Sequence, residues 1–420
     1  MTLTGKGNVL VMQSGGCTPV LNRSLLGVVQ EASGHRAFGE IYGLAHGLEG
    51  ILSSRENDPV KSPQSGGTDH SNSVFRDTGL IDLRAPSKAA WERIARSPGA
   101  ALGSTRHRPG PDDLQVMLDF LARHEVRYWF IIGGNDSAET GHRIGVEAQS
   151  AGYELTVINV PKTIDNDLVL TDHSPGYGSA ARFVAMATMG AGRDAEAMGQ
   201  ASPVTIIEVM GRDTGWLAAS AVLARQDERD APHVICVPEA PVDEARFLDL
   251  MEDAYTRLGF AVAVVAENTR SEDGVLGGQE EPWLVDDFGH PYFDGPARYL
   301  AGLAGRHLKV RARYEKPGTI QRSMTACVSA TDACEAEMAG RSAVRLAAGG
   351  YTDQMVTLVR EPGVKYSCTT GMAPLSRVAG QVETMPDRYL DRTGYDVTSE
   401  FLDYARPLIG RPLPRLGRLL

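Results

Sequence analysis

Short apolar runs rich in valine and isoleucine recur along the chain, and each stops at a cluster of glycine, proline or charged residues. Continuous apolar runs of this length are typical of strands buried on both faces of a sheet. The predicted strands are residues 8–12, 126–132, 154–160, 204–209, 233–237 and 261–266. Helical patterns, such as 111–124 and 245–258, separate them. This alternation predicts an α/β fold with mainly parallel sheets flanked by helices.

Almost every predicted strand has its glycine or charge cluster at its carboxyl end. Open parallel sheets bind ligands in the crevice outside the carboxyl ends of their strands. The pattern therefore predicts one crevice, or two that face each other. Residues 53–72 are polar and rich in turn formers, which predicts a surface loop. Because no low-complexity tether divides the chain, we expect two interleaved domains.

Composition excludes several classes of protein. A net charge of −11 argues against a general nucleic-acid binder, which needs a basic face. No apolar run reaches 18 residues, so no membrane span is expected. Strand-like sequence begins near the amino terminus, so no signal peptide is expected. Five scattered cysteines without a CxxC pair predict reduced thiols in a cytoplasmic protein: Cys17, Cys236, Cys327, Cys334 and Cys368.

Two glycine-rich turns follow predicted strands. Gly15 and Gly16 come before a helical pattern, and N–H groups at such a turn favour an anion. A tight turn without a ligand is the alternative, and no Gly-Lys-Ser/Thr follows to make a Walker loop. The second turn, residues 133–137, contains Asp136. A carboxylate repels phosphate unless a metal or a cation intervenes, so Asp136 implies Mg²⁺ or a lysine, unless it is only a helix cap.

Residues 161–167 (PKTIDND) contain one lysine and two aspartates directly after a predicted strand. Lys162 supplies the cation that Asp136 requires. Asp165 is the candidate base, because a positioned carboxylate can take the proton of an alcohol that attacks phosphorus. Asp167 is expected to orient this base or a neighbouring arginine. A surface turn with solvated charges is the alternative.

Later clusters offer contacts to a sugar phosphate. Arg212 can bind phosphate through two parallel hydrogen bonds. Glu267 ends a predicted strand and can accept hydrogen bonds from sugar hydroxyls. Arg313 and Arg322 lie in a turn-rich basic segment that could clamp a phosphate, and Arg106 is a further candidate. For each of them, a solvated surface charge is the alternative.

Taken together, these clusters resemble the phosphofructokinase family. The resemblance rests on GG at 15–16, GSTR at 103–106, GGNDS at 133–137, PKTIDND at 161–167, EVMGR at 208–212, AE at 266–267 and GTIQR at 318–322. These seven motifs occur in the family's order over about residues 8 to 330. The stretches DFGH at 287–290 and TSEFLDYARPLIG at 398–410 look like the longer, pyrophosphate-using branch.

The resemblance implies a fold of two interleaved domains with the active site in the cleft between them. Residues 1–175 and about 321–380 would bind the phosphoryl donor. Residues 176–320 and about 381–420 would bind fructose 6-phosphate. It further implies a homodimer or homotetramer. The negative net charge and the lack of a long apolar run predict that it binds neither nucleic acid nor membrane.

The same resemblance assigns roles to single residues. Asp165 matches the base that deprotonates the sugar 1-hydroxyl, and Lys162 and Asp136 complete the catalytic set. The implied donor contacts are Gly15, Gly16, Arg106 and Gly134. The implied fructose 6-phosphate contacts are Thr163, Asp167, Met210, Gly211, Arg212, Glu267, Arg313, Thr319 and Arg322, with Arg313 reached across a subunit boundary in relatives. Mg²⁺ is the implied cofactor, with Asn135 at the metal position.

The donor is predicted from two positions. ATP-using relatives have glycine where this chain has Asp136 and Lys162, which leaves space for the α-phosphate of the nucleotide. Here a carboxylate and an ammonium fill that space and can pair, and Lys162 can neutralise charge on the departing phosphate. The expected reaction is the reversible, pyrophosphate-dependent phosphorylation of fructose 6-phosphate in glycolysis and gluconeogenesis. An ATP-dependent 6-phosphofructokinase and a non-catalytic regulatory subunit are the alternatives.

Three positions depart from the family's pattern. Asn135 stands where relatives often have an aspartate metal ligand, so pyrophosphate and water are expected to supply more of the metal's ligands. Pro203 replaces an arginine that in many relatives reaches the partner's 6-phosphate. Thr319 replaces a histidine of the ATP-using relatives. The last two leave details of sugar-phosphate binding open, but not the reaction.

Overall fold

The computed structural model describes residues 6–53, 79–276, 281–285, 289, 291–292 and 294–419. The predicted surface loop at 53–72 lies outside these residues except for its first residue, and so does DFGH at 287–290 except for Gly289. No helix in the described part of the chain is long and apolar enough to cross a membrane.

The chain packs into two interleaved units. Unit 1 consists of residues 1–163, 168–172 and 334–382, and unit 2 of residues 164–167, 173–333 and 383–420. The last boundary lies at 382/383, close to the expected position near 380. The preceding boundary falls at 333/334 rather than near 320. Residues 164–167 also group with unit 2, so the chain changes unit directly after Thr163.

Unit 1 contains a seven-stranded sheet in the order β15-β14-β5-β4-β1-β2-β3. Its strands are β1 (Gly7–Gln13), β2 (Phe38–Leu44), β3 (Leu80–Asp82), β4 (Val126–Gly133), β5 (Thr156–Pro161), β14 (Gln354–Arg360) and β15 (Cys368–Pro374). All neighbouring pairs are parallel except the two at the edges, β2 with β3 and β14 with β15. The sheet is mainly parallel, as expected.

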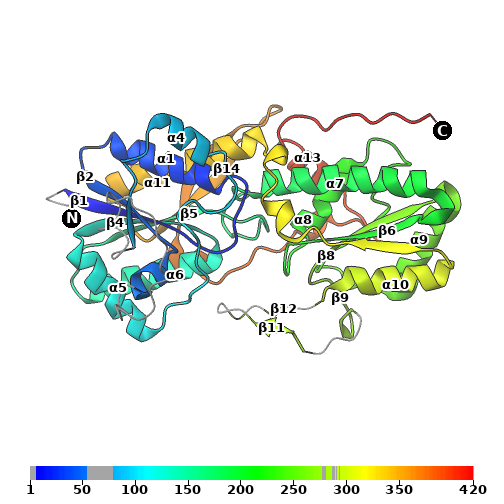
Figure 1. Cartoon of the computed structure of the whole chain (residues 1–420), viewed down its shortest axis with the longest axis horizontal. Coiled ribbons are helices and arrows are strands. Elements are labelled where there is room, and N and C mark those ends of the chain that lie inside the picture. The colour runs from blue at the N-terminus through cyan, green and yellow to red at the C-terminus, as the bar shows by residue number, and fades with distance from the viewer. Residues whose placement is uncertain are drawn as a thin grey trace, which may run out of the picture. The chain divides into compact units, whose positions relative to one another are not determined.

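Helices cover both faces of this sheet (Figure 1). One core cluster joins it to α1 (Leu21–Ser33), α4 (Lys88–Ile94) and α11 (Ala330–Ala348). A second cluster joins the other face to α2 (Leu48–Ser53), α5 (Pro111–Arg123), α6 (Asn135–Ser150) and α12 (Leu375–Val378). Every residue of β5 is buried, which explains why the strand is mostly apolar, although Asn159 within it is polar.

Unit 2 contains a four-stranded, fully parallel sheet in the order β13-β6-β8-β7. Its strands are β6 (Val204–Val209), β7 (Val234–Cys236), β8 (Ala261–Ala266) and β13 (Ala312–Glu315). Figure 1 shows α7 (Tyr177–Met198) on one face and α9 (Glu244–Leu258) with α10 (Pro296–Leu308) on the other.

Smaller elements complete unit 2. They are α8 (Trp216–Ala219), α13 (Ser399–Ala405), the short strands β9 (Arg270–Ser271), β10 (Gly274–Val275), β11 (Leu284–Val285) and β12 (Pro291–Tyr292), and the 3-10 helices η1 (Gly199–Ala201), η2 (Ser220–Ala224), η3 (Gly318–Arg322), η4 (Thr325–Cys327) and η5 (Asp387–Tyr389). The short strands form two antiparallel pairs, β9 with β10 and β11 with β12.

The six predicted strands and the two named helices are all confirmed, with ends that differ by at most two residues. The α/β class is confirmed as well. The hydrophobic pattern did not predict the remaining strands. Three of these lie at a sheet edge, namely β3, β13 and β15, and two lie next to an edge, namely β2 and β14. The others are the short antiparallel pairs of unit 2. In β2, Gly39, Glu40 and Gly43 interrupt the apolar residues, and in β15 Ala373 is the one buried residue, so neither strand reads as an apolar run.

Two glycines set the spacing of α1 and α11 in unit 1. A Cβ atom on Gly27 would overlap the backbone carbonyl oxygen of Glu337, and one on Gly340 would overlap that of Ser24. The two helix backbones therefore touch at this crossing. A side chain at either position has to push the helices apart.

We expect Gly340→Ala to destabilise unit 1 by about 1–3 kcal/mol, because overpacking a close contact costs that much. Gly145→Ala in α6 is the matched control, since its Cβ would lie an ordinary 3.7 Å from Cγ2 of Val157. Replacing glycine by alanine in an unstrained helix stabilises by roughly 0.5–1 kcal/mol. Thermal unfolding of both variants measures this difference, and a Gly340→Ala variant at least as stable as the wild type would contradict the close crossing.

Candidate active site

Parallel pairing places the two predicted donor loops next to each other in unit 1. Gly133 of β4 pairs with Pro161 of β5, so Gly134 and Lys162 leave the sheet side by side. A Cβ atom on Gly134 would lie 3.6 Å from the carbonyl oxygen of Lys162. The structure thus brings the second glycine-rich turn against the lysine of residues 161–167.

The side chain of Lys162 lies against the first glycine-rich turn. Its Nζ donates a hydrogen bond of 2.6 Å to the carbonyl oxygen of Gly16, and only 3% of the residue is exposed. Gly15 has a φ of +76°, and a Cβ atom there would approach Nζ to 3.2 Å. Both the backbone conformation and the space therefore favour glycine at this position.

Residues 103–106 are hydrogen-bonded to the same turn. The backbone N–H of Gly15 donates to the carbonyl oxygen of Thr105 at 2.9 Å, and Oγ of Ser104 donates to the carbonyl oxygen of Gly15 at 2.6 Å. Thr105 is buried and donates its hydroxyl to Glu49. Arg106, which follows directly, is partly buried. The predicted donor residues of unit 1 thus belong to one connected set of loops.

The start of α6 carries Asn135 and Asp136 in its first turn, after Gly134 as the residue that precedes the helix. The Asn135 side chain accepts a hydrogen bond from the backbone N–H of Asp136 at 3.0 Å and donates to the carbonyl oxygen of Gln381 at 3.3 Å. The side-chain oxygen of Asn135 and the carboxylate of Asp136 are therefore both at the helix start. The hydrogen bond from Arg108 to Glu139 and the charge of Glu139 raise the pKa of Arg108, and the charge of Asp136 adds a smaller contribution in the same direction.

Unit 2 holds the backbone at the candidate base and two residues after it. Asp165 is partly buried, and its carbonyl oxygen accepts a hydrogen bond from Oγ1 of Thr214 at 3.3 Å. The carbonyl oxygen of Asp167 accepts from the backbone N–H of Glu383 at 2.8 Å. Thr163, the last residue of this unit 1 segment, is partly buried.

The ends of β6 and β8 bring the next predicted residues together in unit 2. Val209 pairs with Ala266, so Met210 and Glu267 follow neighbouring strand ends. The backbone N–H of Arg212 donates to Oε1 of Glu267 at 3.1 Å.

The turn that carries Arg212 is strained. Gly211 and Arg212 both have positive φ, +139° and +49°. A non-glycine residue in this region typically costs about 1–3 kcal/mol and clusters at functional sites. The strain supports a functional assignment for residues 210–212.

The pKa of Glu267 is raised to about 7, first by burial and then by the charge of Asp165. Two carboxyl groups that interact in this way resist ionising together. Near neutral pH Glu267 is therefore protonated in part. A neutral carboxyl group can donate a hydrogen bond as well as accept one, which suits a hydroxyl ligand.

The basic segment after α10 divides into two parts. In η3, the buried side chain of Gln321 accepts from the backbone N–H of Met210 at 3.1 Å, so its neighbours Thr319 and Arg322 lie on an element that touches the Met210 strand end. Arg313 of β13 instead pairs with Asp194 of α7, at 3.1 Å between Nη1 and Oδ2. Within this chain, η3 therefore contacts the candidate site, whereas Arg313 forms an ion pair with α7.

Hydrophobic and charge patterns did not single out Thr214, Glu383 or Asn166. They also missed Tyr404, whose hydroxyl accepts a hydrogen bond of 2.7 Å from Nδ2 of Asn166. Thr214 lies in the motif after β6, but threonine carries no charge to draw attention to it. Glu383 acts through its backbone, which no side-chain pattern reveals. Tyr404 lies in the stretch at 398–410 that was matched only by resemblance.

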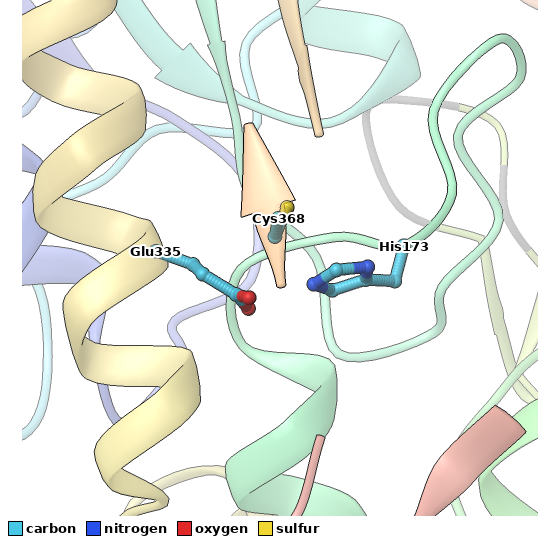
Figure 2. A group of neighbouring side chains, drawn as sticks. All are labelled: His173, Glu335 and Cys368. Carbon is cyan, nitrogen blue, oxygen red and sulfur yellow. The ribbon is translucent and has the colours of Figure 1, made fainter. Parts of the chain in front are cut away.

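A separate group of polar side chains lies in unit 1. Figure 2 shows Glu335 of α11 and Cys368 of β15, whose ligand atoms lie within 4.8 Å of one another; it also labels His173. The Tyr366 hydroxyl donates to Glu335 at 2.5 Å. Burial, and then the charge of Glu335, raise the pKa of the Cys368 thiol to about 12. Cys368 is therefore not a reactive thiolate at neutral pH.

Comparisons with known proteins show which family the chain is similar to. The model of the phosphofructokinase family matches residues 8–347. A pyrophosphate–fructose 6-phosphate 1-phosphotransferase of Rhodospirillum rubrum is 37% identical over 420 residues, which cover 99% of this chain and 97% of that protein. One of Xanthomonas campestris is 34% identical over 97% of this chain and 93% of its own.

A solved structure is similar over the whole chain. The pyrophosphate-dependent phosphofructokinase of Nitrosospira multiformis superposes with a TM-score of 0.84 at 30% identity, covering 99% of this chain and 95% of that one. The similarity therefore extends over both units and includes the carboxyl-terminal segment.

The raised pKa of Glu267 predicts a pH-dependent stability. The folded state holds a proton that the unfolded state loses above about pH 4.5, so this residue lowers stability progressively as the pH rises from about 4.5 to about 7. Glu267→Gln removes the titration. From pH 5 to pH 8, the variant should gain about 1–3 kcal/mol relative to the wild type.

Urea unfolding of wild type and Glu267→Gln at pH 5 and pH 8 measures this gain. Glu272→Gln, which changes an exposed carboxylate, is the control and should follow the wild type at both values. A constant difference between Glu267→Gln and wild type across this range would show that ionisation of Glu267 does not destabilise the folded state.

Proposed function

This chain belongs to the phosphofructokinase family, and we propose that it transfers a phosphoryl group from pyrophosphate to the 1-hydroxyl of fructose 6-phosphate. The products are fructose 1,6-bisphosphate and phosphate. The observation that carries the proposal is the buried Lys162 ammonium against the carbonyl oxygen of Gly16 in the first glycine-rich turn. The names of the relatives described above support it.

The position of Lys162 supports pyrophosphate over ATP as the donor. Its ammonium fills the space beside Gly15 and Gly16, where a nucleotide would place further phosphate. A fixed cation at this turn can stabilise the charge that grows on the departing phosphate, and it needs no rearrangement to do so. Asp136, on the neighbouring strand end, adds a negative charge that disfavours a longer polyphosphate chain.

Asp165 would act as the general base. As the 1-oxygen of the sugar bonds to phosphorus, the bond from phosphorus to the departing phosphate breaks and the hydroxyl proton passes to the Asp165 carboxylate. Arg212 and Arg322 would bind the 6-phosphate, with Thr319 beside it and Arg313 as a further contact from a partner subunit. Thr163, Asp167, Met210, Gly211 and Glu267 would contact the sugar. The P–O–P bond of pyrophosphate and the product ester have comparable transfer potential, so the reaction runs in both directions.

Magnesium is the cofactor that we propose. The Asn135 side chain and the Asp136 carboxylate offer oxygen atoms, which are the ligands that Mg²⁺ prefers. The Asn135 oxygen accepts one hydrogen bond from Asp136, and an amide oxygen has a second lone pair for a ligand. Asn135 would therefore hold the ion, together with pyrophosphate and water. When bound, it would neutralise charge on pyrophosphate.

We further propose a cytoplasmic homodimer or homotetramer that works in glycolysis and gluconeogenesis. The five cysteines are all free, which fits a reducing compartment. The two alternatives have weaker support. An ATP-dependent enzyme needs space that Lys162 fills, and a regulatory subunit has no use for Asp165, which this chain keeps.

Lys162→Met should reduce turnover with pyrophosphate by about 10²–10³-fold, because removing one preorganised charge partner of a transition state typically costs about 3–4 kcal/mol. Lys88→Met, an exposed lysine of unit 1, is the matched control and should retain full activity. Steady-state rates with pyrophosphate and with ATP measure both variants. Near-normal turnover of Lys162→Met with pyrophosphate would contradict the donor assignment.

Asp165→Asn should lower kcat by roughly 10²–10⁴-fold and leave KM for fructose 6-phosphate nearly unchanged, as expected when a general base is lost. Asp213→Asn, an exposed aspartate of the same unit, controls for loss of charge. Initial rates over a range of substrate concentrations separate kcat from KM. A raised KM with unchanged kcat would make Asp165 a binding residue instead.

A further inference from the structure

The turn that carries the candidate base depends on an unusual backbone conformation. Asn166, between Asp165 and Asp167, has a φ of +60°. Asparagine visits this left-handed region more readily than most residues, but the surrounding structure has to hold it there. The directions in which the two flanking carboxylates leave the backbone therefore depend on how firmly Asn166 is held.

The Asn166 side chain is clamped at both ends. Its Oδ1 accepts a hydrogen bond from the backbone N–H of Ser174 at 2.9 Å, and its Nδ2 donates to the hydroxyl oxygen of Tyr404 at 2.7 Å. Because a backbone N–H can only donate, the orientation of the amide is unambiguous. Only 3% of Asn166 is exposed, so water is a poor substitute for either partner.

Tyr404 is itself held by a cluster of aromatic rings. We define the aromatic cluster as Trp216, Tyr389, Phe401 and Tyr404. The centroid of the Tyr404 ring lies 5.3 Å from that of Trp216, 5.4 Å from that of Tyr389 and 6.1 Å from that of Phe401. Tyr404 is 8% exposed. Rings packed at these distances fix the phenol well enough to place its hydroxyl.

The aromatic cluster reaches the turn at a second point. Nε1 of Trp216 donates to the carbonyl oxygen of Glu383 at 3.2 Å, and the backbone N–H of Glu383 donates to the carbonyl oxygen of Asp167 at 2.8 Å. The cluster thus supports two consecutive residues of the turn. It holds Asn166 through the Tyr404 hydroxyl and Asp167 through the Glu383 backbone.

We propose that Tyr404 is a positioning residue for catalysis: its hydroxyl holds the Asn166 amide, and this fixes the left-handed turn that aims the Asp165 carboxylate at the attacking hydroxyl. The inference rests on the proposed function, in which Asp165 is the general base. A base must lie within about 2.6–3.2 Å of the proton it takes. A displacement of about 1 Å can cost roughly 10²-fold in rate.

Tyr404→Phe tests the inference, because it removes the hydroxyl and keeps the ring in the cluster. We expect kcat to fall about 10–100-fold, with KM for both substrates within about twofold of wild type. Tyr389→Phe is the matched control, because it removes a hydroxyl from the same cluster. That hydroxyl accepts a hydrogen bond of 3.3 Å from the neighbouring Arg388, whereas the Asn166 amide donates to the Tyr404 hydroxyl. The control should retain wild-type kcat.

A second variant tests whether Tyr404 acts through Asn166. Asn166→Gly accepts the positive φ without strain but has no amide to hold, so it should lower kcat by a similar factor. In this background, Tyr404→Phe should cause no further loss, because the contact it removes is already gone. Full additivity of the two effects would overturn the inference. Equal kcat values for Tyr404→Phe and Tyr389→Phe, or a raised KM at unchanged kcat, would do the same.

The outcomes also separate this inference from the proposed function. If the wild type uses ATP rather than pyrophosphate, the same comparison of kcat is made with ATP, and only the donor assignment fails. A wild type inactive with both donors would overturn the proposed function and the inference that rests on it. An active wild type whose Tyr404→Phe variant matches Tyr389→Phe would overturn the inference alone.

Discussion

In-register parallel pairing of neighbouring strands is the constraint on which the candidate site depends. In unit 1, the pair Gly133 and Pro161 places the second glycine-rich turn beside Lys162. In unit 2, the pair Val209 and Ala266 places Met210 beside Glu267. A shift of either register by one residue would turn these side chains to the opposite face of the sheet. The positions of the residues at the strand ends therefore depend on the register of the strands that carry them.

Beyond the strand ends, the backbone conformation of the turns sets the direction of the candidate site side chains. Asn166 and Arg212 both adopt a left-handed backbone conformation, which is uncommon outside glycine. Hydrogen bonds hold each of them: Ser174 and Tyr404 bind the Asn166 side chain, and Glu267 accepts from the Arg212 backbone. Strain that is balanced by local hydrogen bonds gives a rigid site, and rigidity is what a base and a phosphate contact require.

The sequence predicted the buried strands and the residues at their ends for a physical reason. A strand covered on both faces is mostly apolar, so a run of valine and isoleucine marks it, even where a single buried polar residue such as Asn159 in β5 or Glu208 in β6 interrupts the run. Edge strands such as β15 lack this pattern, because one side meets solvent. The raised pKa of Glu267 depends on burial and on its approach to Asp165, and neither can be derived from sequence separation. Tyr404 reads as an ordinary core aromatic until its hydroxyl is seen to bind Asn166.

The central claim is that the ammonium of Lys162 beside Gly16 selects pyrophosphate as the donor. The most direct test is to measure kcat/KM of the wild type with pyrophosphate and with ATP, in one buffer with saturating fructose 6-phosphate and Mg²⁺. The account predicts that kcat/KM with pyrophosphate exceeds kcat/KM with ATP by at least about 10²-fold, which is the typical effect of one preorganised charge at a transition state. An equal or higher value with ATP would contradict it.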